Sequence, residues 1–172
     1  MPQLTDFELN EIFRLKKVFY KLCSATGYLS KEQFLQIECI DRNPLKERIY
    51  SCIIDPYKQR KHFPDDDVEL DLKMFLVGLS QFNNQGHRDQ KLKIAFRLHD
   101  FDDDDFISKK DLELYITAIT RSTELSTEEV AEVVNNVFLE FPQECQSSGI
   151  PFLEFQKVVG VTDFQAKLQI PI

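Results

Sequence analysis

The stretch that decides the fold is DFDDDDFISKKD, which runs from Asp100 to Asp111. Oxygen donors recur in it at alternate positions, and a carboxylate closes it at the twelfth. A hard divalent cation takes about six to eight oxygen ligands, and this spacing lets a single turn supply most of them. The alternative is an acidic surface turn that binds no metal. We predict one Ca²⁺ or Mg²⁺ site with the ligands Asp100, Asp102, Asp104, the carbonyl of Phe106, Ser108 and Asp111.

The segments on both sides of this stretch are predicted helices. Apolar residues recur at helical spacing in DQKLKIAFRLH before it and in DLELYITAIT after it. Helix, acidic turn and helix together are the arrangement of an EF-hand. We expect Ser108 to cap the outgoing helix with Asp111 at its third position. Ile107, at the eighth loop position, is expected to pair in a short strand with a second loop.

Two residues depart from the ideal calcium loop. Asp105 stands at the sixth position, where the chain turns through positive φ and glycine is preferred, so some affinity should be lost. Asp111 is one methylene shorter than the usual glutamate, so it reaches a large Ca²⁺ ion with both oxygens less easily. Mg²⁺ therefore becomes a real competitor, and we expect a structural metal or a weak sensor rather than a strong calcium switch.

Two helix-loop-helix units precede this hand, and neither carries its ligands. In the first, the loop between Leu22 and Phe34 has no carboxylate at its donor positions. In the second, VELDLKMF keeps the rhythm of an exit helix, with Leu70 at the strand position and Met74 in place of the closing carboxylate. We expect both loops to be metal-free.

A fourth unit follows, with a loop of ordinary length from Gln143 to Glu154. Its first, third and fifth positions carry no carboxylate, so the affinity for a metal is removed even if Glu154 is available. Its expected role is structural, because Ile150 can pair with Ile107 and hold the third loop in shape.

Capping boxes predict where three helices begin: Thr5 to Glu8, Ser30 to Gln33 and Ser126 to Glu129. The first of these helices should end near Leu22. Another helix should start at Asn43 and Pro44. The polar segment DPYKQRKHFPDDD, residues 55–67, contains two prolines and is predicted to be an exposed loop.

These units predict an all-α fold of two lobes, each a pair of EF-hands, with a short C-terminal lid. A single unit cannot bury its own apolar face, whereas a pair can. The stretch NNQGHRDQ is the most linker-like between the halves. We therefore place the N-terminal pair at 1–83, the C-terminal pair at 84–160 and the lid segment at 161–172.

Composition restricts the classes of partner and of chemistry. The 172 residues include 21 basic and 29 acidic ones, a net charge of -8, which argues against nucleic acid or an anionic membrane as the main partner. No apolar run is long enough for a membrane span, and we expect no direct membrane insertion. The four cysteines are scattered and no nucleophile and base set appears, so we expect reduced thiols, a cytoplasmic protein and no enzymatic activity.

Several segments resemble known EF-hand families. NPLKERI, AFRLHDFDDDD, EFQKVV and DFQAKLQI resemble the calcium- and integrin-binding protein family. More loosely, SQF, QKLKIAFR and VVG resemble calcineurin B and the calcineurin B homologous proteins. The resemblance implies two EF-hand pairs that bind an amphipathic helix of a partner in a hydrophobic channel, with Asp163 to Ile170 as a movable lid. Our chain departs from these families in its empty loops, the fourth above all.

The leading functional hypothesis is a non-enzymatic adaptor or regulatory subunit that captures an amphipathic helix, from the cytoplasmic part of a membrane receptor or channel. Through such a partner it could sit peripherally at a membrane. The alternative is a regulatory subunit of a phosphatase or kinase, as calcineurin B is for a phosphatase. A third possibility is that the apolar stripes are core packing and nothing else.

Overall fold

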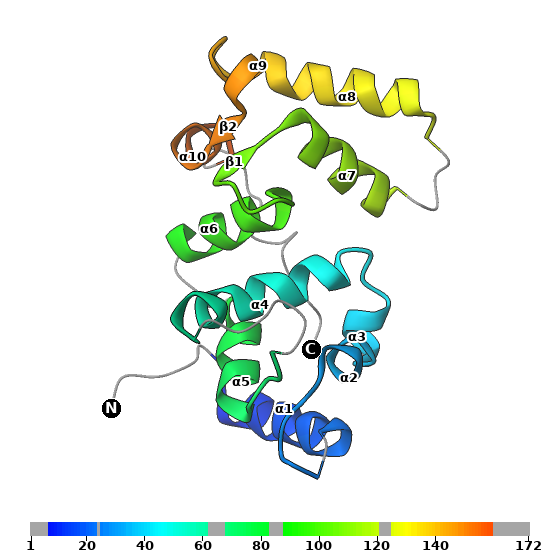
Figure 1. Cartoon of the computed structure of the whole chain (residues 1–172), viewed down its shortest axis with the longest axis vertical. Coiled ribbons are helices and arrows are strands. Elements are labelled where there is room, and N and C mark those ends of the chain that lie inside the picture. Colours follow the sequence, from blue (N-terminus) through cyan, green and yellow to red (C-terminus); the bar gives the residue numbers. More distant parts are fainter. Residues whose placement is uncertain (1–6, 24, 62–67, 83–87, 121–124, 160–172) are drawn as a thin grey trace. The chain divides into compact units, whose positions relative to one another are not determined.

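A computed structural model describes residues 7–23, 25–61, 68–82, 88–120 and 125–159. Its contacts group the chain into two units, one up to Lys91 and one from Leu92, which are described separately below. The elements of both are shown in Figure 1. The predicted lobe boundaries stay predictions, and the predicted lid at 161–172 lies outside the described residues.

The first unit contains the two N-terminal helix-loop-helix units. Its helices are α1 (Leu9–Leu22), α2 (Lys31–Leu35), α3 (Glu38–Asp41), α4 (Lys46–Lys61) and α5 (Leu72–Ser80). The two loops meet in an antiparallel bridge between Leu29 and Leu70, whose backbones exchange two hydrogen bonds of 2.9 Å. Both residues are completely buried, so this bridge also forms part of the core.

Two of the predicted helix starts differ from the structure. The helix predicted to start at Asn43 and Pro44 begins two residues later, at Lys46. Ser30 caps α2 in a box with Gln33, and α1 ends at Leu22 as expected. The box from Thr5 to Glu8 is wrong, because α1 begins later and Glu8 is itself the capping residue. Glu8 has extended backbone angles and its N–H donates to the carboxylate of Glu11 at 2.8 Å, which sets up the same reciprocal arrangement one turn further along.

The loop predicted over residues 55–67 is wrong for its first part. Helix α4 continues through Pro56 to Lys61. A proline inside a helix removes one backbone hydrogen bond and crowds the preceding turn. Here the turns before it are fixed by packing, since Cys52, Ile53 and Ile54 are buried, and the helix persists past the proline. Residues 62–67 lie outside the described part of the chain.

The core of the first unit is aromatic, in line with the composition. The ring of Phe75 lies 5.4 Å from that of Phe19 and 6.4 Å from that of Phe34, and Phe34 in turn lies 5.4 Å from Tyr50. The hydroxyl of Tyr50 donates to the carbonyl of Val68 at 2.5 Å. This hydrogen bond ties α4 to the second loop two residues before the bridging residue Leu70.

The second unit contains the third and fourth helix-loop-helix units. Its elements are α6 (Arg88–His99), β1 (Phe106–Ile107), α7 (Lys109–Ile119), α8 (Thr127–Leu139), α9 (Cys145–Ser148), β2 (Ile150–Pro151) and α10 (Phe152–Val159), the first of which starts just before the division between the units. The strands are antiparallel, with Ile107 opposite Ile150. The predicted pairing of these two residues is confirmed, as is the capping box of Ser126 and Glu129 at the start of α8.

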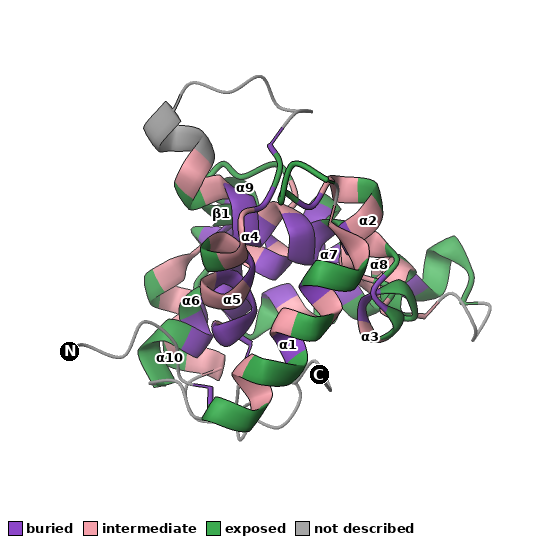
Figure 2. Cartoon of the chain, turned by 90° about the horizontal axis from the view of Figure 1, so that it is seen from below, coloured by how far each residue is buried: buried purple, intermediate pink, exposed green. Residues whose placement is uncertain are grey.

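The fold is therefore helical with paired EF-hands, as the sequence predicts. Figure 2 shows buried residues gathered on the inner sides of the helices and exposed ones on their outer sides. Among the described residues, no helix has both the length and the apolar character needed to cross a membrane.

A substitution at Gly78 tests how closely α4 and α5 pack against each other. A methyl group there would overlap Cγ2 of Ile53 and lie 2.9 Å from its Cγ1, and Ile53 is completely buried. We predict that Gly78→Ala lowers the free energy of unfolding by about 1 to 2 kcal/mol, because the overpacking outweighs the helix propensity of alanine. Urea unfolding measures this loss. In an Ile53→Ala background the same substitution should be neutral or stabilising; an equal loss in both backgrounds would contradict the packing argument.

Candidate metal centre

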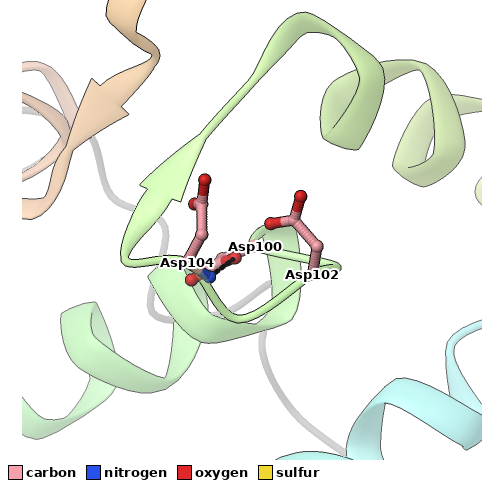
Figure 3. Close-up of side chains that lie close together, drawn as sticks. All are labelled: Asp100, Asp102 and Asp104. Atoms are coloured by element: carbon pink, nitrogen blue, oxygen red, sulfur yellow. Dashed lines mark hydrogen bonds between the residues drawn. The ribbon is translucent and has the colours of Figure 1, made fainter.

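Three of the predicted ligands come together in the turn between α6 and β1. Oxygens of Asp100, Asp102 and Asp104 lie within 4.8 Å of one another. Figure 3 shows their side chains along this single turn. Two oxygens that bind the same Ca²⁺ at about 2.4 Å can be at most about 5 Å apart. The donor set and its spacing therefore fit one hard divalent cation.

The carboxylates of the loop differ in their surroundings. Asp100 is only 3% exposed and Asp111 only 2%, whereas Asp102 and Asp104 are open to solvent. The side chain of Asp100 accepts backbone hydrogen bonds from Asp104 at 3.2 Å and Asp105 at 3.1 Å. These bonds curl the turn around the first ligand, so part of the site is formed by the protein alone.

Asp111 closes the loop from its other end. Its Oδ1 accepts from the N–H of Phe101 at 3.1 Å, and its Oδ2 accepts from the N–H and the hydroxyl of Ser108 at 2.8 and 2.5 Å. Ser108 caps α7 in the box predicted from the sequence. The structure thus places Ser108 and Asp111 against each other, outside the group formed by the three nearer carboxylates. Their part in binding the metal stays a prediction.

The backbone of the loop bears out the expected turn at Asp105. Asp105 has φ 69° and Asp103 has φ 57°, both in the left-handed region that most side chains avoid. Aspartate tolerates this region better than most residues. Phe106 follows in β1, and its N–H donates to Oδ1 of Asp104 at 2.9 Å. That strand positions the carbonyl of Phe106, the remaining predicted ligand.

His99, the last residue of α6, directly precedes the loop. Burial lowers its pKa. Its Nδ1 lies 2.7 Å from the carbonyl of Ala95, so Nδ1 carries the proton, and its ring stacks on Tyr115 at 4.0 Å. A neutral imidazole adds no positive charge next to the acidic turn, so the electrostatic attraction of the loop for a cation is preserved.

The fourth loop is built differently. Where the third loop has its carboxylate turn, the fourth has the helical turn α9, in which Cys145 is buried. Glu154, the one acidic residue kept from the ligand pattern, forms an ion pair with Lys157 at 2.6 Å. A side-chain cation thus stands beside the carboxylate that a metal would need. That this loop binds no metal stays a prediction, and its ligand spacing gave no signal of the ion pair with Lys157.

The structure also reveals an apolar pocket in the first unit that the sequence could not separate from the core. Its volume is about 610 Å³, and α1, α3 and α5 contribute to its lining. The buried residues Leu15, Ile40 and Phe75 line it together with the less buried Val18 and Leu22. The polar residues Lys21, Gln36, Glu38 and Arg42 also line it.

The sequence is similar to those of known EF-hand proteins. The model of the EF-hand domain pair matches residues 89–160, which contain the third and fourth loops. The chain is 30% identical over 168 residues to calcineurin B of Candida glabrata, covering 96% of this chain and 89% of that relative. The chain belongs to the calcineurin B family. It is also 32% identical to calcineurin B of Naegleria gruberi, over 99% of the chain and 90% of the relative. With the type 2 calcineurin B of Mus musculus the identity is 33%, over 95% of the chain and 86% of the relative.

Membership in the calcineurin B family settles the broad functional class. The chain is an EF-hand, calcium-binding regulatory protein and is not itself an enzyme. The number of its metal sites stays a prediction, and the loop geometry above is the argument for one.

The predicted site can be tested with two matched substitutions in the same loop. Asp100→Asn removes a buried ligand charge and should weaken Ca²⁺ binding on the order of a hundredfold. Asp103→Asn removes the same charge from an exposed residue outside the ligand set, at a φ that asparagine tolerates, and should cost only a few fold. Calorimetric titration of Ca²⁺, with and without Mg²⁺, measures both. Equal losses would mean that the loop attracts cations by its general charge and has no defined site.

Proposed function

We propose that this protein is a regulatory subunit that holds an amphipathic helix of a larger partner in the apolar pocket of its first unit. The pocket carries the proposal. Its lining is mostly apolar, it lies between helices of a paired EF-hand unit, and charged side chains line it beside the apolar ones. A helix with anchors at i, i+3 or i+4 and i+7 can place them in such a pocket.

The relatives bear on the class of partner. Each of them is named as a subunit of calcineurin, so each works within a larger assembly. This supports a catalytic partner, a phosphatase or kinase, more directly than a membrane receptor or channel. The receptor hypothesis depends on the resemblance of NPLKERI and AFRLHDFDDDD to calcium- and integrin-binding proteins, and it is the second candidate.

One metal ion in the loop from Asp100 to Asp111 completes the proposal. Bound there, Ca²⁺ or Mg²⁺ would neutralise the crowded carboxylates and fix the turn between α6 and α7. The hydrogen bonds of Asp100 and Asp111 already shape both ends of the loop, and β1 is paired with β2. These features favour a structural ion over a strong switch.

Val18→Glu tests the pocket. Val18 lines it, so a carboxylate there should prevent an apolar anchor from entering and weaken the binding of a partner helix about tenfold or more. Asn10→Glu is the control, because Asn10 is exposed on the same helix, does not line the pocket, and gives the same change of charge. Titration of a synthetic helix from the identified partner provides the measurement. If both variants bind it equally well, the pocket is not the docking site.

The partner class is decided by purifying the tagged protein from its own cells in the presence of Ca²⁺. Co-purification of a phosphatase or kinase, with loss of that enzyme in the Val18→Glu variant, supports the subunit proposal. Recovery of an integral membrane protein instead supports the receptor hypothesis.

A further inference from the structure

The pocket of the first unit is lined by three charged side chains, and two of them neutralise each other. Lys21 comes from α1, whereas Glu38 and Arg42 come from α3 and its C-cap. Arg42 and Glu38 form an ion pair, with 2.9 Å between Nη2 and Oε1. Asp41, the other carboxylate of α3, pairs with Lys46 at 2.7 Å. Within the part of the chain that the structure describes, no carboxylate forms an ion pair with Lys21, so the lining has one positive charge in excess.

Lys21 lies directly beside the apolar part of the lining. It is an exposed residue in the last turn of α1, and Val18 and Leu22 of the same helix also line the pocket. Residues three apart on a helix are neighbours on its surface, so Lys21 and Val18 lie next to each other. A lysine in such a place can keep its aliphatic stem against apolar groups and its ammonium group in water. An apolar anchor that enters beside Val18 therefore comes within reach of this cation.

We propose that the pocket selects a helix that carries a carboxylate beside its apolar anchor, so that this carboxylate pairs with Lys21. This proposal rests on the proposed function and specifies the chemistry of the ligand at the same pocket. The net charge of the whole chain is -8, which by itself would favour a basic ligand. Exposed charges more than about 8 Å apart are screened at physiological salt, however, so the charges of the lining decide which side chain is preferred beside Val18.

The expected contribution is to selectivity more than to affinity. A glutamate one turn from an apolar anchor of the ligand lies on the same side of the ligand helix as that anchor. An ion pair between exposed side chains strengthens binding only about two- to fivefold, and the burial of apolar groups supplies most of the affinity. A lysine at the same position of the ligand would be repelled by Lys21. Glutamate should therefore be preferred over lysine by about tenfold.

Designed peptides test this selectivity. The parent is a helical peptide of alanine and glutamine with leucines at i, i+4 and i+7. In one series of variants a single glutamate replaces a residue beside the leucines, at each flanking position in turn, and a second series carries lysine at the same positions. Fluorescence anisotropy of the labelled peptides measures each Kd. At one flanking position glutamate should bind about tenfold more tightly than lysine, and this preference should weaken as the salt concentration is raised.

Three protein variants assign the preference to its residue. Lys21→Gln should abolish the preference, and Lys21→Glu should reverse it. Lys17→Glu makes the same charge reversal at an exposed lysine of α1 that does not line the pocket, and it should leave the preference unchanged. The preference is a ratio of two affinities for one protein variant, so a general loss of stability does not imitate the effect.

The possible results separate this proposal from the proposed function. Peptide binding that is lost in Val18→Glu but shows no preference for glutamate, or a preference that Lys21→Glu leaves unchanged, would overturn this proposal alone. Tightest binding by a lysine variant would also overturn it and assign the pocket to a basic helix. Binding that Val18→Glu does not weaken, or no binding by any peptide, would overturn the proposed function and this proposal with it.

Discussion

The pairing of neighbouring loops is the constraint on which the rest of the structure depends. In the first unit Leu29 and Leu70 exchange two backbone hydrogen bonds, and in the second Ile107 pairs with Ile150. All four side chains are buried. Each pairing both satisfies backbone groups and closes a hydrophobic core over two hands. A loop without metal ligands therefore still has a function, because its partner loop cannot hold this arrangement alone.

Once the two loops are paired, each loop needs only local interactions that stabilise its own turn. The third loop uses carboxylates that accept backbone hydrogen bonds and gather oxygens for a cation. The fourth uses the helical turn α9, Gly149 at φ 83°, and an ion pair between Glu154 and Lys157. The acidic residue at the twelfth loop position therefore has different partners in the two hands. Asp111 accepts hydrogen bonds from backbone N–H groups in the third loop, whereas Glu154 pairs with Lys157 in the fourth.

The sequence predicted those features that depend on a few neighbouring residues. Ser30, Ser108 and Ser126 each cap a helix with the partner three residues on, and the strand positions of Ile107 and Ile150 follow from loop length alone. The predictions from sequence were wrong or incomplete where packing between residues far apart in the chain determines the structure. Residues 55–67 were expected to form a loop, but the buried side chains before Pro56 hold α4 together as far as Lys61. The apolar pocket could not be predicted, because Leu15 and Val18 have the same helical spacing whether they fill a core or line an opening.

Helix α1 shows how one short helix can carry several surfaces. Leu15 and Phe19 anchor it in the core, Val18 and Leu22 line the pocket, and Leu9, Phe13 and Tyr20 are exposed. Only the first of these surfaces is needed for the fold. The other two leave apolar groups exposed or partly exposed, which lowers solubility unless something covers them. The net charge of -8 hides the basic character of helix α1, because most of the acidic residues that set this charge lie elsewhere, five of them in the turn from Asp100 to Asp105. The charge of a chain as a whole therefore does not determine the partner of an individual face, and the side chains around that face must be considered on their own.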